Sequence, residues 1–172
     1  YSLFMQFKYD EAIPLYEKLI AQGFDNFESN FILGLCYEDQ PDNEKALKHY
    51  QKAVQFKSDN ATCLFHLALV EKSFCMDSLS MAHFNQSLEV SLPKDRALRT
   101  YKWLADLHFQ HSRYADAARD FELCTLYDEE DNPLNYYNAA QMFIASKNKL
   151  KAKLYLQMFL ANANRLEDKK EA

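Results

Sequence analysis

Three groups of side chains have the residue types and spacing from which a reactive site could be built. His108 and His111 are three positions apart, so on a helix both imidazoles would share one face and could bind a metal ion. Cys75 and His83 could serve as a nucleophile and its general base. The acidic run at 128–131 offers the paired carboxylates that general acid–base chemistry uses.

None of the three groups is complete as a site. No third metal ligand accompanies the two histidines, and the place of His108 recurs elsewhere as Tyr37 and Phe143, so packing explains it. No residue in the sequence orients Cys75 toward a base. Acidic residues ahead of a helix interact favourably with its dipole, which explains the run at 128–131. We therefore expect no catalytic residue, no metal, no cofactor and no enzymatic activity.

Composition excludes several further classes of protein. The 172 residues include two glycines, Gly23 and Gly34, whereas a P-loop, a dinucleotide-binding turn and a nucleophile elbow each need closely spaced glycines. A net charge of −5 argues against binding to a nucleic-acid backbone, which requires a basic face. No apolar run approaches the roughly 18 residues of a membrane-spanning helix, so direct membrane insertion is not expected.

The elements that position these side chains are set by an internal repeat. The pattern of residues 9–19 returns at 43–53, which is 34 positions later. A small residue marks each of five units, and in four of them a second small residue lies twelve positions earlier. The first series is Ala12, Ala46, Ser80, Ala117 and Ala152, and the second is Gly34, Ala68, Ala105 and Ala140.

Each unit has the apolar spacing of two amphipathic helices joined by a short polar turn. Phe31 and Leu33 suit a first helix, Ala46 and Tyr50 suit a second helix, and Asp42 is a suitable N-cap between them. Small side chains on the first helix would let the helix axes approach closely. One such pair cannot bury its apolar face alone, so the pairs are expected to stack. Residues suited to capping lie between the units at Asp25-Asn26, Asp59-Asn60, Asp95 and Asp131-Asn132.

Two units carry the repeat pattern most fully. Its residues are Leu33, Gly34, Tyr37, Ala46, Tyr50 and Ala53 in one unit and Leu104, Ala105, His108, Tyr114, Ala117, Phe121 and Cys124 in the other. They resemble the signature of the tetratricopeptide repeat (TPR) family, and the resemblance covers nearly the whole chain. It implies an all-α fold, a right-handed superhelical TPR solenoid of antiparallel helix pairs with about four and a half repeats.

We expect residues 1–172 to form a single TPR array that is a fragment of a longer chain. The first unit lacks most of its first helix, because twelve positions before Ala12 falls ahead of Tyr1. The third unit has the weakest signature, since Glu71 and Ser80 stand where larger or more apolar residues are common. The repeats are predicted at 1–26 (partial), 27–60, 61–97, 98–132 and 133–168.

In the family that the chain resembles, the first helices line a concave groove that holds segments of other proteins. The resemblance therefore implies a protein–protein interaction scaffold that binds a peptide or helix of a partner protein in this groove. Apolar side chains would anchor the partner, and basic ones would favour acidic residues beside the anchors. The groove residues carried over to this sequence are Phe31, Leu35, Phe65, Leu69, Lys72, Arg99, Lys102, Phe109, Tyr137 and Gln141.

A structural role is the alternative: a spacer or oligomerisation segment of a larger assembly. The last predicted helix, at 150–165, carries Leu150, Leu154 and Phe159 with no polar capping helix after it, so it could form a homo-oligomer with another copy. The four cysteines form no CxxC pair, which favours free thiols in a reducing compartment such as the cytoplasm. A periplasmic or exported location would require a signal upstream of Tyr1.

Overall fold

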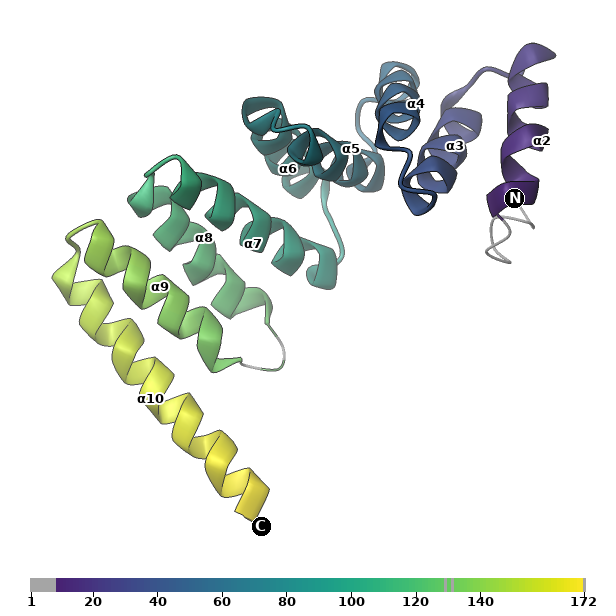
Figure 1. Cartoon of the computed structure of the whole chain (residues 1–172). Helices are drawn as coiled ribbons and strands as arrows, with labels where there is room; N and C mark the ends of the chain where they lie inside the picture. Colours follow the sequence, from purple (N-terminus) through teal and green to yellow (C-terminus); the bar gives the residue numbers. More distant parts are fainter. Residues whose placement is uncertain (1–8, 129, 131, 172) are drawn as a thin grey trace. The chain divides into compact units, whose positions relative to one another are not determined.

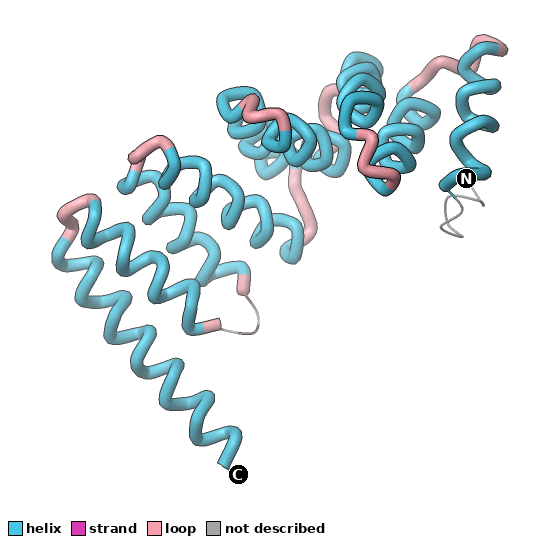
Figure 2. Tube along the Cα trace, in the orientation of Figure 1, coloured by secondary structure: helices cyan, strands magenta, loops and turns pink. Residues whose placement is uncertain are grey.

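The computed structural model describes residues 9–128, 130 and 132–171, and the start of the first predicted repeat at 1–8 lies outside them. Within these ranges every regular element is a helix, and no strand is present (Figure 2). No described helix is long and apolar enough to span a lipid bilayer. The all-α fold class is therefore confirmed.

The first of two compact units runs from Tyr1 to Leu92, and its described helices each pack against the next along the chain (Figure 1). They are α2 (Tyr9–Ala21), α3 (Phe27–Asp39), α4 (Asn43–Phe56), α5 (Ala61–Ser73) and α6 (Asp77–Val90). Because α3 also contacts α5, one helix pair stacks on the following pair as a repeat array requires. The pairs α3/α4 and α5/α6 lie within residues 27–60 and 61–97.

The second unit runs from Pro93 to Ala172, and its helices also pack in chain order. They are α7 (Lys94–Gln110), α8 (Tyr114–Tyr127), α9 (Pro133–Ala145) and α10 (Lys149–Glu171). Helix α7 begins four residues before the predicted repeat boundary at 98. The reason is local: Pro93 lies outside the helix in an extended conformation, with φ −53° and ψ 149°, and a helix can start directly after it.

Polar side chains cap α3, α4, α5 and α9, as their positions in the sequence predicted. Asn26, Asp42, Asn60 and Asn132 each accept a hydrogen bond from a backbone N–H of the first turn, at 2.9–3.2 Å. Asp95 was expected to lie in a linker and instead lies within the first turn of α7. A carboxylate there still interacts favourably with the helix dipole.

The close helix approach predicted from the small residues is present in the structure. A Cβ atom on Gly34 would lie 2.5 Å from Cε1 of Tyr50, so glycine is required opposite this ring. The equivalent Ala68, Ala105 and Ala140 are all completely buried. The first helix of each pair therefore meets the second across a small side chain, and the repeat units share one packing frame.

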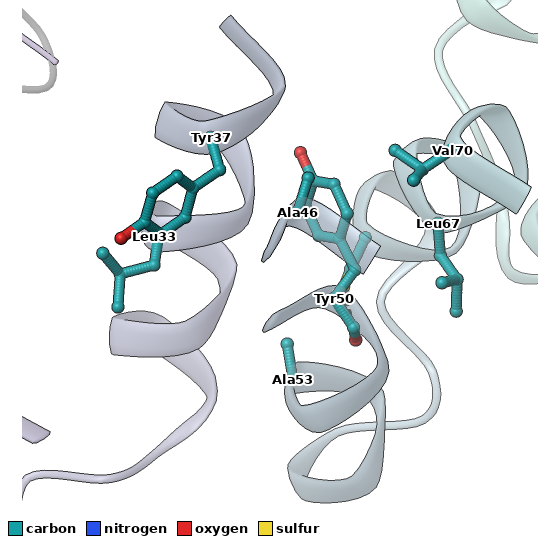
Figure 3. Close-up of a cluster of buried hydrophobic side chains, with 8 residues drawn as sticks. Leu33, Tyr37, Ala46, Tyr50, Ala53, Leu67 and Val70 are labelled. Carbon is teal, nitrogen blue, oxygen red and sulfur yellow. Dashed lines mark hydrogen bonds between the residues drawn. The ribbon is translucent and has the colours of Figure 1, made fainter. Parts of the chain in front are cut away.

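Each of the two compact units has its own hydrophobic core. In the first compact unit the core lies among α3, α4 and α5, with Tyr50 of α4 between Leu33 of α3 and Leu67 of α5 (Figure 3). Its buried members are Leu33, Tyr37, Ala46, Tyr50, Ala53, Cys63, Leu67 and Val70. The corresponding cluster of the second unit contains Ala118, Ala139, Ala140, Phe143, Ala152 and Tyr155.

The turns inside three of the helix pairs share one geometry, which the turn at Pro41, with φ 26°, does not adopt. Cys75, Ser112 and Lys147 each follow the first helix of a pair at the same repeat position, with φ of 55°, 57° and 63°. This left-handed conformation ends a helix sharply and is most often occupied by glycine. The chain has no glycine at these positions, so the turns persist because the helices on both sides are packed together.

Candidate functional site

The predicted groove residues lie on the first helices of the pairs, as expected for a TPR-like array. Those of α3 and α5 belong to the first unit, and those of α7 and α9 belong to the second unit. The two sets differ in exposure. In the first unit most of these side chains take part in packing, whereas in the second unit most of them are exposed.

In the first unit the aromatic groove residues are used within the core. Phe31 stacks on Phe27 with ring centroids 5.5 Å apart and also lies 6.1 Å from the ring of Tyr50. Phe65 is 2% exposed and packs against Phe84 at 6.0 Å, so its ring has no free face of useful size. Of the remaining predicted residues, Leu35, Leu69 and Lys72 are half-buried.

A polar cluster that the sequence analysis did not predict lies beside these rings. The hydroxyl of Tyr50 donates a hydrogen bond of 2.5 Å to Oε2 of Glu38, and Nδ1 of His66 lies 2.9 Å from the same oxygen. Burial, followed by the nearby Glu38 carboxylate, raises the pKa of Tyr50 far above its ordinary value, so the hydroxyl remains a donor. The cluster holds the Glu38 carboxylate in one orientation.

This carboxylate opens onto a small surface cavity. The cavity has a volume of about 330 Å³ and is lined by Tyr9, Leu35, Glu38, Asp39 and His66. The contact between Glu38 and Tyr50 could have been anticipated from their spacing in the sequence. They are twelve residues apart, as are the paired small residues of the repeat. Residues twelve apart face each other across a helix pair.

In the second unit the predicted apolar residues are exposed to solvent. Phe109 of α7 is 48% exposed, and its ring centroid lies 6.0 Å from that of Tyr114. Tyr137 of α9 is 39% exposed and lies 5.4 Å from the ring of Phe159. Arg99 and Lys102, also predicted, are exposed on α7. Gln141 of α9 is half-buried.

Two residues that face each other, one on each helix of a pair, differ in chemical type from repeat to repeat. At this place Tyr37 stacks on His49, and Phe143 packs on Tyr155. In the two repeats between them the pair is polar and in opposite order: Nδ1 of His83 lies 2.7 Å from Glu71, and Nδ1 of His108 lies 2.6 Å from Asp120. Burial raises the pKa of Asp120, and the hydrogen bond with His108 acts against that shift.

These pairs account for His83 and His108, two of the three histidines considered for reactive sites; the third, His111, is exposed. His83 is held by Glu71 rather than by Cys75, and His108 is held by Asp120 in the interior of its helix pair. Within the described ranges, no group of three or more His, Cys, Asp or Glu side chains is arranged to hold a metal ion. His83 and His108 therefore contribute to packing between the first and second helices of their pairs.

The thiols provide a test of this packing. Burial raises the pKa of Cys36 to about 11 and the pKa values of Cys63 and Cys124 to about 12, whereas Cys75 is exposed. At pH 8 we expect a thiol reagent to modify Cys75 within minutes and the other three only as the protein unfolds, because fewer than about one in a thousand of them is ionised. Mass spectrometry of peptides after timed labelling measures this. Equal modification of Cys36 and Cys75 under native conditions would contradict the packing.

With the fold and the surface described, the chain can be compared with known proteins. A sequence profile described as anaphase-promoting complex, cyclosome, subunit 3 matches residues 5–76. DnaJ homolog subfamily C member 3 of Gallus gallus is 23% identical over 130 residues, which are 70% of this chain and 26% of that protein. The chain thus spans about a quarter of the length of this relative.

Solved structures share the fold over almost the whole chain. The crystal structure of MamA superposes with a TM-score of 0.76 at 14% identity, covering 97% of this chain and 95% of that one. YrrB, described as a TPR protein with an unusual peptide-binding site, gives a TM-score of 0.74 at 16% identity, covering 92% of this chain and 80% of that one. The chain has the tetratricopeptide-repeat fold. Stacked arrays of helix pairs with this fold present extended concave surfaces that bind other proteins.

Proposed function

We propose that this TPR protein binds a peptide or helix of a partner protein, with its main anchors on the first helices of the second unit. The observation that carries the proposal is the exposure of large apolar side chains at the positions that the TPR resemblance assigns to the groove. Phe109 and Tyr137 are joined by Leu134 and Ile144, which are 60% and 51% exposed. Exposed apolar side chains gathered on one set of helices are typical of binding surfaces.

The exposed aromatic rings suit anchoring. Aromatic side chains lose little conformational entropy on binding and contribute much of the energy of protein interfaces. Arg99 and Lys102 lie on the same helix as Phe109, so acidic residues next to the partner's anchors would be attracted. In the first unit, Phe65 is left out of the proposed contact because its ring is buried.

The test compares two alanine variants of the full chain. The partner is first isolated by affinity capture and mass spectrometry, and its bound segment is made as a peptide. We expect the double variant Phe109→Ala/Tyr137→Ala to bind this peptide roughly 10- to 100-fold more weakly, because two central anchors are lost. Isothermal titration calorimetry gives the dissociation constants, and circular dichroism shows whether the helices are intact.

The matched control is Leu126→Ala. Leu126 is 75% exposed on α8, which is a second helix and carries none of the predicted groove residues. Its replacement should leave the dissociation constant unchanged. If the double variant binds as tightly as the unmodified chain, the anchors lie elsewhere and the proposal fails.

A further inference from the structure

The charges of this chain are unevenly distributed along its sequence. Residues 133–166 contain four lysines and one arginine and no Asp or Glu, so all 25 acidic residues of the chain lie outside this segment. The segment comprises α9 and most of α10. A chain with a net charge of −5 therefore carries a cationic region on its last helix pair.

The structure places a groove within this cationic region. The groove has a volume of about 440 Å³ and lies along α10 beside the end of α9. Its lining is predominantly apolar, from Ile144, Ala152, Leu156 and Leu160. Three exposed lysines complete it: Lys147, Lys149 and Lys153.

This face of α10 is left open by the packing. Ala152 and Tyr155 are the buried residues that join α10 to the core of the second unit. By contrast, Leu160, which lines the groove, is 57% exposed. Lys151 is engaged in the fold, because its ammonium group lies 2.8 Å from Oε2 of Glu122. The lysines of the groove are therefore a separate set from the lysine that stabilises the helix pair.

We propose that this groove receives an acidic amphipathic helix of a partner protein. The groove extends from Lys149 to Leu160, about 16 Å along α10, which corresponds to about three turns of a docked helix. Apolar residues on one face of that helix would pack on Ile144 and Leu160. Carboxylates along its flanks would pair with Lys149 and Lys153, so the charges as well as the shapes are complementary.

The same charges argue against a second copy of this chain in the groove. A symmetric dimer through this face would bring Lys149 and Lys153 of both copies together, and like charges facing each other across an interface are unfavourable. The groove shares Ile144 with the exposed apolar residues of α9 but contains neither Phe109 nor Tyr137, so the two proposals can be tested separately.

The experiment uses the full chain and two synthetic amphipathic peptides of about 18 residues, long enough to form a helix. Both carry leucines on one face; the acidic peptide has glutamates on its flanks, and its basic twin has lysines there. We expect the acidic peptide to bind at least roughly tenfold more tightly by fluorescence anisotropy. The variant Lys149→Glu/Lys153→Glu should reverse this preference, because it replaces two positive charges beside the groove by negative ones.

The matched control, Lys48→Glu/Lys57→Glu, makes the same change in net charge at exposed lysines of the first unit and should leave the preference intact. Phe109→Ala should also leave it intact. Equal binding of the two peptides, or a preference that survives Lys149→Glu/Lys153→Glu, would overturn the proposal. So would binding of phosphatidylserine vesicles without binding of either peptide. Self-association in sedimentation runs that Lys149→Glu/Lys153→Glu abolishes would assign the groove to a second copy instead.

Discussion

Replacement of Tyr50 by alanine is expected to lower the free energy of unfolding of the first unit by about 3–5 kcal/mol. Its ring is completely buried and is a member of the core that joins α3, α4 and α5. The rings of Phe31 and His66 lie 6.1 and 5.8 Å from it. Removing the ring leaves a cavity between two repeats, and it leaves Glu38 without its hydroxyl donor.

The variant Tyr50→Phe separates these two contributions. It keeps the ring against Gly34 and removes only the hydroxyl, so we expect a loss of about 1–2 kcal/mol. Urea unfolding followed by far-ultraviolet circular dichroism measures both variants, and the first unit should unfold at lower urea than the second in Tyr50→Ala. A loss below about 1 kcal/mol in Tyr50→Ala would show that the α3–α4–α5 core does not depend on this ring.

The variant His83→Leu is expected to lower the free energy of unfolding by about 2–4 kcal/mol. Glu71, its partner at 2.7 Å, is 1% exposed. Without His83 this buried carboxylate would lose its cationic or hydrogen-bonding partner, and breaking a buried pair on one side is costly. This loss of stability is smaller than for a fully buried pair, because the side chain of His83 is itself 23% exposed.

The double variant Glu71→Leu/His83→Leu should recover most of this loss and lie within about 1 kcal/mol of the unmodified chain. The chain itself supplies the reason, because the same pair of positions holds Phe143 and Tyr155 in another repeat, with ring centroids 5.3 Å apart. Thermal unfolding of the two single variants and the double variant completes the cycle. If the double variant is as unstable as the sum of the single variants, the two residues do not act as a pair.

The polar pairs across the helix pairs show why one repeat pattern accommodates side chains of different chemical type. The helix pair requires that two facing side chains fill a fixed space and satisfy each other's polar groups. Glu71 with His83 meets that requirement, and so does the reversed pair of His108 with Asp120. Because the requirement concerns the pair, a single residue of it can look anomalous when the sequence is considered one position at a time.

Much of the fold could be predicted from the sequence. The 34-residue repeat, the amphipathic spacing and the capping residues Asn26, Asp42 and Asn60 are local signals, and each of them was found in the structure where it was expected. The start of α7 was less predictable, because Pro93 and Asp95 allow a helix to begin at more than one residue. A boundary between helices depends on packing as well as on capping.

The candidate surface was harder to predict from the sequence than the fold was. Repeat position places Phe65 and Tyr137 in equivalent sites, and the sequence contains nothing that distinguishes them. In the structure Phe65 packs against Phe84 and is buried, whereas Tyr137 remains 39% exposed. Whether an aromatic side chain faces its own core or the solvent depends on the size of its neighbours on other helices.

The type of element, the length of the repeat and the stacking of helix pairs were therefore predictable from the sequence, because these follow from periodic burial of apolar residues along one chain. Three further features became known from the packed helices: which rings stay exposed, how Tyr50 and His66 orient Glu38, and where the lysines of α10 border an apolar groove. Each of these depends on side chains from different helices meeting in space, and that proximity is a property of the packed chain.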